Sequence, residues 1–129
     1  MELQISKRKT FVPDFCENKK AEKSKQIFVE YDYPTISLKE KISAKNKARA
    51  ISSTQGAIEH IEIEMAIDES LLINSVNLKI NNCSYACEGE SHVITTAKEL
   101  FNAPCVFAPL KAEIVKDIQS SLEGVAEKN

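Results

Sequence analysis

Residues 95–124 have the sequence TTAKELFNAPCVFAPLKAEIVKDIQSSLEG, which predicts two consecutive helices. Thr96 and Glu99 have the spacing of a capping box, so a short helix is expected to begin there. Pro109 suits the first turn of a second helix, and Gly124 suits its end. Apolar side chains recur at every fourth position of this second helix: Leu110, Ile114, Ile118 and Leu122. This stripe predicts a helix that packs against a hydrophobic core.

The segment before these helices predicts a strand, a helix and a hairpin in turn. Apolar side chains alternate with Glu and Ala over residues 61–67, which is typical of a strand with one buried face. Asp68 is placed as the cap of a helix that is expected to end at residues 81–82. The apolar residues of this helix share one face: Leu72, Ile73, Val76 and Ile80. Residues 83–94 predict two short strands joined around Gly89 as a hairpin.

In the first half of the chain, residues 26–33 are rich in β-branched and aromatic side chains and predict a strand. A short helix over residues 37–42 is expected next, capped by Ser37 or Thr35. Residues 44–56 carry mainly Lys, Arg, Ser and other polar side chains, with few that are suited to burial. We therefore expect a mobile basic loop at residues 44–56. Contact regions are often built from such segments.

Residues 1–25 predict an extended N-terminal arm. Leu3 and Ile5 alternate with polar residues, and Pro13 disfavours a helix before it. Residues 26–129 then form a single domain. Strands and helices do not alternate regularly in this domain, so the pattern favours an α+β fold over a doubly wound sheet. We expect one small antiparallel or mixed sheet with three to four helices packed on one face.

Composition indicates a soluble globular domain. The chain has 129 residues, of which 43% are hydrophobic and 28% charged. It contains no apolar run of the roughly 18 residues needed to cross a membrane. Its first residues lack the apolar core of a secretory signal, so we expect a cytosolic protein.

Charge is divided unevenly along the chain. Residues 1–58 contain 12 Lys or Arg and 7 Asp or Glu, whereas residues 59–129 contain 5 and 12. Acidic residues interrupt most of the basic segments, and the last of them has no accompanying aromatic residues for base stacking, so we do not expect nucleic acid as a partner. An acidic protein surface, including the second half of a neighbouring copy, remains an alternative partner for the basic half.

Four cysteines, Cys16, Cys83, Cys87 and Cys105, are too few in a chain of this length to indicate a disulfide framework. If Cys83 and Cys87 lie on one strand they are about 13 Å apart, at roughly 3.3 Å per residue, which is too far for a disulfide. We expect buried, neutral thiols. A zinc site from Cys83, Cys87, His92 and Cys105 is the alternative, although a strand would hold the first two thiolates apart.

Catalytic patterns are weak. His60 and His92 have no histidine partner at helical spacing, and a dyad of His92 with Cys87 or Cys105 is an open alternative. The glycines are too scattered for a phosphate-binding loop. A group of acidic residues could suggest a divalent-cation site: Glu59, Glu62, Glu64, Asp68 and Glu69. Strand alternation instead places Glu62 and Glu64 on one exposed face, which favours a solvated surface. We therefore predict no catalytic, cofactor-binding or metal-binding residue, no small-molecule substrate and no enzymatic activity.

Several segments together resemble small proteins encoded in phage and prophage tail-gene clusters, of the tail assembly chaperone type. These segments are Lys9-Thr10-Phe11-Val12-Pro13-Asp14-Phe15, Ile27-Phe28-Val29-Glu30-Tyr31, Pro34-Thr35, Ile94-Thr95-Thr96-Ala97-Lys98-Glu99-Leu100-Phe101, Pro109-Leu110 and Glu113-Ile114. The resemblance follows the layout of most of the chain and carries no catalytic or ligand signature.

The resemblance implies an assembly factor that binds other tail proteins, such as the tape-measure or tube protein, in the cytoplasm of a bacterial host. One alternative is a subunit that stays in the finished particle, such as a tail-tube, terminator or connector protein. Another, from the residues alone, is a Cys/His zinc or thiol protein. Self-association into a homo-oligomer is compatible with the first two.

Overall fold

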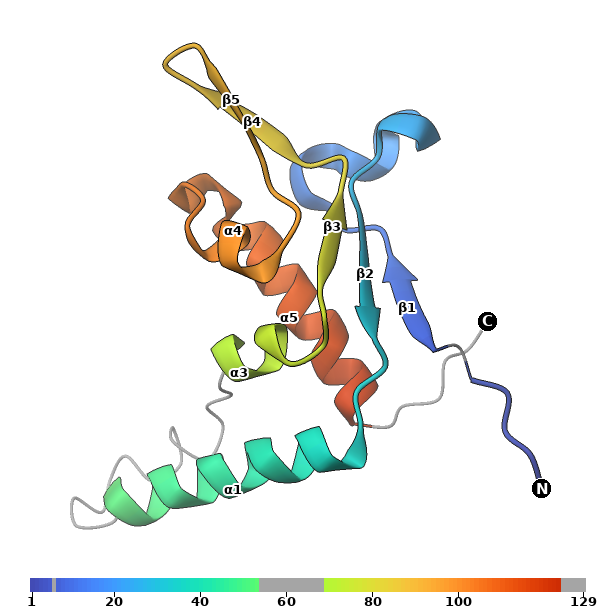
Figure 1. The fold of residues 1–129 in the computed structure, drawn as a ribbon, viewed down its shortest axis with the longest axis vertical. Coiled ribbons are helices and arrows are strands. Elements are labelled where there is room, and N and C mark those ends of the chain that lie inside the picture. Colours follow the sequence, from blue (N-terminus) through green and yellow to red (C-terminus); the bar gives the residue numbers. More distant parts are fainter. Residues whose placement is uncertain (6, 54–68, 124–129) are drawn as a thin grey trace.

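The computed structural model describes residues 1–5, 7–53 and 69–123, and only the backbone over residues 45–53. This part of the chain forms two small antiparallel sheets together with helices, as Figure 1 shows. The predicted α+β class is confirmed. The predicted strand over residues 61–67, the cap at Asp68 and the helix end at Gly124 lie outside the described residues.

The main sheet has three strands in the order β1 (Arg8–Phe11), β2 (Phe28–Asp32) and β3 (Lys79–Asn81), all antiparallel. The central strand β2 confirms the strand expected at residues 26–33. Its side chains alternate, so that Val29 and Tyr31 are fully buried while their neighbours are partly exposed. This alternation gives the sheet one face for the core and one for solvent.

The arm predicted over residues 1–25 is wrong from Arg8 onward. Arg8–Phe11 is a strand of the main sheet, and tight turns η1 (Phe15–Lys20) and η2 (Lys23–Lys25) follow it. The buried side chain of Asn18 closes this segment onto β2: its amide donates to the Ile27 carbonyl at 2.8 Å, and its oxygen accepts from the Ile27 N–H at 2.7 Å. A single amide thus satisfies main-chain groups of the incoming strand.

Helix α1 (Ile36–Ser53) corrects the prediction of a loop from residue 44. The Thr35 hydroxyl accepts a hydrogen bond from the Leu38 N–H at 3.2 Å, which confirms the expected cap. Few residues from 44 onward are apolar, but Ala, Lys and Arg are among the strongest helix formers and continue the helix beyond its first turns. Residues 54–56 of the predicted loop lie outside the described residues.

Helix α3 (Glu69–Asn74) ends at Asn74, whereas the predicted helix continued to residues 81–82. Asn77 has a φ of 51°, a left-handed conformation that ends helices. Ile80 then lies in β3 opposite Val29, with both side chains fully buried. Ile80 is buried as predicted, but it lies in a strand and not in a helix.

The region after β3 agrees closely with prediction. Strands β4 (Ser84–Cys87) and β5 (Glu90–Val93) form the predicted hairpin, a separate two-stranded sheet rather than part of one sheet. Helix α4 (Ala97–Phe101) begins with the predicted capping box, and Pro109 lies in the first turn of α5 (Ala108–Leu122). In Figure 1 the hairpin projects from one end of the molecule, and α1 crosses the opposite end.

The core lies between the main sheet and α5. The predicted apolar stripe of α5 is confirmed, since Leu110, Ile114 and Ile118 are fully buried and Leu122 is partly buried against the same core. A polar contact crosses the boundary of sheet and helix: the Tyr31 hydroxyl donates to Asp117 Oδ2 at 2.5 Å. Burial of this hydroxyl is therefore compensated by a charged acceptor.

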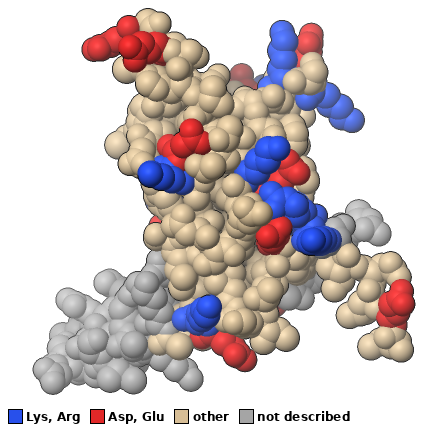
Figure 2. All heavy atoms as spheres, in the orientation of Figure 1, with Lys and Arg blue, Asp and Glu red and all other residues tan. Residues whose placement is uncertain are grey.

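Charged residues of the two halves of the chain meet in the folded molecule. Lys9 Nζ of the first half lies 3.4 Å from Asp117 Oδ2 of the second half, whereas Arg8 Nη1 lies 2.7 Å from Asp32 Oδ1 within the first half. Figure 2 shows Lys or Arg close to Asp or Glu at several places on the visible face. The basic first half of the sequence is thus partly matched to acidic partners within the same chain.

Candidate functional site

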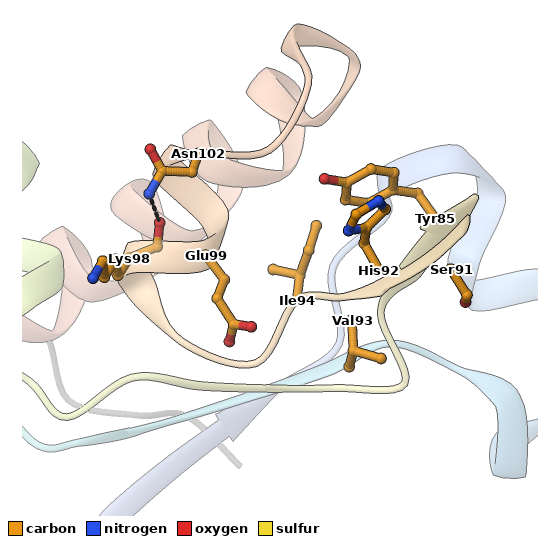
Figure 3. Close-up of a pocket in the computed structure, with 8 residues that line it drawn as sticks. All are labelled: Tyr85, Ser91, His92, Val93, Ile94, Lys98, Glu99 and Asn102. Atoms are coloured by element: carbon orange, nitrogen blue, oxygen red, sulfur yellow. Dashed lines mark hydrogen bonds between the residues drawn. The ribbon is translucent and has the colours of Figure 1, made fainter. Parts of the chain in front are cut away.

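A groove with a volume of about 540 Å³ lies between strand β5 and helix α4. We call it the β5 groove, and Figure 3 shows its lining residues: Tyr85, Ser91, His92, Val93, Ile94, Lys98, Glu99 and Asn102. The hairpin supplies one wall and the helix the other. The segment between them, residues 94–96, is short, so the two walls are held close together.

The β5 groove is bordered by a strand edge with unpaired main-chain groups. The Ile94 N–H donates to the Cys83 carbonyl at 2.9 Å, which fixes that pair as hydrogen-bonded. Because such pairs alternate in an antiparallel hairpin, the N–H and C=O groups of Ser91 and Val93 point away from β4. Both residues line the groove, so their main chain is available to an added strand.

The hairpin turn sets this geometry. Glu88 and Gly89 are its two central residues, with φ values of 51° and 81°. Two consecutive left-handed residues form the type I′ turn, whose twist matches that of two paired strands. The turn fixes the register of β4 and β5, and the register decides which residues of β5 face outward.

Aromatic and aliphatic side chains form much of the hairpin wall. The Tyr85 and His92 rings stack with their centroids 4.9 Å apart, and the Tyr85 ring also lies 5.5 Å from that of Phe107. Val93 is 58% exposed, whereas Ile94 next to it is 1% exposed. Ile94 anchors the base of the hairpin in the core, and Val93 offers an apolar side chain to solvent or to a partner.

The helix wall is polar and held by its cap. The Thr95 hydroxyl donates to Glu99 Oε1 at 2.5 Å, and the Thr95 and Thr96 N–H groups donate to the same oxygen at 3.1 Å each. The hydrogen bond from the Thr95 hydroxyl, followed by those from the main chain, lowers the pKa of Glu99 below its ordinary value. The Glu99 carboxylate therefore stays charged at the edge of the groove.

The sequence predicts the hairpin and the helix that form the β5 groove, but it does not predict the groove itself. The capping box and the Gly89 turn were recognisable signals for its two walls. The distance between the two walls has no such signal, because it depends on how Ile94 and Phe107 pack into the core. Val93 and Ile94 are both apolar in the sequence, and only the structure shows that the first is exposed and the second buried.

The expectation of buried thiols is confirmed for Cys83 and is wrong for the other three cysteines. Cys83 is buried, and burial raises the pKa of its thiol, whereas the other three are exposed: Cys16, Cys87 and Cys105. Among the described residues, no group of three or more His, Cys, Asp or Glu side chains is placed to hold a metal ion. The alternative zinc ligands Cys83, Cys87, His92 and Cys105 are therefore not brought together.

The alternative dyad of His92 with Cys87 also finds no support in the hairpin register. His92 lies opposite Tyr85, whereas Cys87 lies opposite Glu90, two positions further along. His60 and the acidic residues from Glu59 to Asp68 lie outside the described residues. Among the helices that are described, none is both long and apolar enough to span a membrane.

Comparison with known proteins gives no match to a protein-family model, to a curated protein or to a solved structure. The geometry of the β5 groove and the resemblance of the sequence are thus the grounds for assigning a function.

Proposed function

We propose that this protein binds an extended segment of another protein in the β5 groove, and that it acts in this way as a phage-tail assembly factor in the bacterial cytoplasm. The observation that carries the proposal is the outward main chain of Ser91 and Val93 beside the groove. The sequence resemblance to tail assembly chaperones supplies the class of partner, a tape-measure or tube protein.

The chemistry of the groove suits an extended polypeptide. Main-chain groups of β5 pair with any sequence, and side chains on the walls select among sequences. The exposed Val93 on one face of β5, and the stacked His92 and Tyr85 rings on the other, favour apolar side chains at neighbouring positions of the bound segment. Lys98 and Glu99 on the helix wall add charges of both signs, which fix its direction.

Co-expression with tape-measure and tube proteins tests this function. We expect one of them to co-purify with the wild-type protein. Ser91→Pro should abolish this, because proline removes the outward N–H and blocks strand addition. Val93→Lys should weaken it by about tenfold or more, since it places a charge in the apolar part of the interface.

Val106→Lys is the matched control, because Val106 is 63% exposed and lies outside the groove. It should leave co-purification unchanged. An equal loss of co-purification with Val93→Lys and with Val106→Lys would contradict a role for the β5 groove. Failure of the wild-type protein to bind any tail protein at low salt would contradict the assembly function itself.

A subunit that remains in the particle is the second candidate, and the open outer edge of β1 favours it. A subunit must contact more than one neighbour, and β1 and β5 offer two separate strand edges. Mass spectrometry of purified particles separates the two functions. An assembly factor is absent from the finished particle, whereas a subunit is present in many copies.

A further inference from the structure

A second hollow, with a volume of about 440 Å³, lies at the base of the β4–β5 hairpin. We call it the rear hollow, and these residues line it: Ser24, Lys25, Asn82, Cys83, Ser84 and Val93. Val93 also lines the β5 groove, so the two hollows meet at Val93. A segment that is bound along β5 therefore lies next to both of them.

Side-chain alternation places the two hollows on opposite faces of the hairpin. Ser84 lies opposite Val93, and Tyr85 lies opposite His92, one position further along each strand. Successive side chains of a strand point to opposite faces, and Figure 3 shows Val93 on the other side of β5 from the two rings. A segment added to β5 has the same alternation, so it presents neighbouring side chains to the rear hollow and to the β5 groove.

Asn82 joins the two parts of the chain that form the rear hollow. Its side-chain amide donates to the Ser24 carbonyl at 3.3 Å and to the Gln26 carbonyl at 3.0 Å. Asn82 has a φ of 62°, a left-handed conformation between β3 and β4. Because both bonded carbonyls flank Lys25, the main chain of Lys25 is held beside the base of the hairpin.

The rear hollow offers hydrogen-bond donors and a positive charge. Among the described residues, Lys25 Nζ has no acidic partner within ion-pair distance, and the Ser24 and Ser84 hydroxyls make no hydrogen bond. The residues that line the hollow include no Asp or Glu. Cys83 adds no negative charge near neutral pH, because burial raises the pKa of its thiol. This donor set suits a carboxylate.

We propose that the segment bound along β5 carries an acidic side chain opposite Val93, and that its carboxylate enters the rear hollow beside Lys25. The two neighbouring side chains of the segment are apolar and face the β5 groove, on the side of the Tyr85 and His92 rings. The inference rests on the function proposed for the β5 groove. It adds the sequence that the site selects, which is an acidic residue between two apolar ones.

An acidic side chain fits this position better than the other classes of side chain. A basic one would lie beside Lys25 with like charge, which is destabilising. An apolar one would take Lys25 and the hydroxyls of Ser24 and Ser84 out of water without giving them a partner. Glu90 is the acidic residue of β5, but it lies opposite Cys87 at the turn, away from the base of the hairpin.

Binding of synthetic peptides, measured by fluorescence anisotropy, tests this selection. Each labelled probe alternates valine with threonine, and its central threonine is replaced by glutamate, by glutamine or by lysine. At low salt the wild-type protein should bind the glutamate peptide about threefold more tightly than the glutamine peptide and about tenfold more tightly than the lysine peptide. The preference should shrink at high salt, because the charges lie near the surface.

Reversing the charge of Lys25 tests its role in this selection. Lys25→Glu should invert the order, so that the lysine peptide binds most tightly. Lys23→Glu is the matched control, since Lys23 is exposed on the same turn η2 and does not line the rear hollow. It should keep the wild-type order. An unchanged order in Lys25→Glu, or the same inversion in both variants, would overturn the inference.

Ser91→Pro separates this inference from the function of the groove. It should abolish the binding of all three peptides, because proline removes an outward N–H of β5. Equal binding of the three peptides by the wild-type protein, lost in Ser91→Pro, would overturn the selection of an acidic residue and leave strand addition intact. No binding of any peptide to the wild-type protein up to about 1 mM would overturn both.

Discussion

The outer edges of β1 and β5 present the same main-chain chemistry in different surroundings. Strand β1 belongs to a three-stranded sheet that α5 covers, and Lys9 of β1 reaches Asp117 of that helix. Strand β5 belongs to a two-stranded hairpin whose strand residues are exposed except for the partly buried Tyr85. One edge is therefore fixed to the core along its length, and the other is held mainly at its base.

Both edges present outward N–H and C=O groups, so the side chains beside each edge are what distinguish them. Basic residues lie on β1, and Arg8 Nη1 is 2.7 Å from Asp32 Oδ1 of the neighbouring strand β2. The β5 edge faces a groove with apolar and charged walls, which suits a segment of another protein.

The largest expected effect comes from breaking the base of the β5 hairpin. Ile94→Ala should lower the free energy of unfolding by about 2–5 kcal/mol, because it leaves a cavity where a side chain with 1% exposure packs. Chemical denaturation measures this. Val93→Ala is the control and should change stability by less than about 0.5 kcal/mol, since Val93 is exposed. Similar losses for both would show that the hairpin is not anchored at Ile94.

The next effect concerns the attachment of the main sheet to α5. Tyr31→Phe should lower the free energy of unfolding by about 1–3 kcal/mol, because it removes a buried hydrogen bond to the Asp117 carboxylate. Tyr33→Phe should change it little, since Tyr33 is only partly buried and its hydroxyl makes no hydrogen bond among the described contacts. Thermal unfolding of the two variants compares them, and equal stability of both would contradict the anchoring of the β1 sheet.

A smaller effect is expected at the hairpin turn. Gly89→Ala should cost about 1 kcal/mol, because φ is 81° and alanine is strained there although a Cβ meets no atom within 4 Å. Gly89→Asn should cost less, since asparagine tolerates this conformation. Urea unfolding tests the order of the two variants. A larger cost for asparagine would show that steric contact, and not backbone conformation, governs the turn.

The smallest effect is the pH dependence of the α4 cap, which forms the helix wall of the β5 groove. Hydrogen bonding lowers the pKa of Glu99 in the folded state, so its contribution to stability is present above the unfolded pKa. That contribution is lost as pH falls through the lower, folded pKa. Glu99→Gln should therefore be less stable than wild type near neutral pH, and the difference should shrink in acid. A difference that is constant with pH would contradict this origin.

The elements best predicted from the sequence are those with local signals. The capping box at Thr96, the left-handed turn at Gly89 and the apolar stripe of α5 each specify a structure through neighbouring residues. The predictions that failed concern residues whose local secondary-structure preference and whose burial point to different elements. Helix α1 continues through residues with few apolar side chains, and Ile80 joins a strand instead of the helix that its spacing suggested.

The sequence by itself determined the α+β class, the cap, the hairpin turn and the buried face of α5, because these depend on contacts between residues a few positions apart. Only the tertiary structure decided that Arg8–Phe11 joins β2, that three cysteines are exposed, and that β5 and α4 enclose a groove. These features depend on which distant side chains share one core. That choice is made by packing and main-chain pairing, which no short stretch of sequence records.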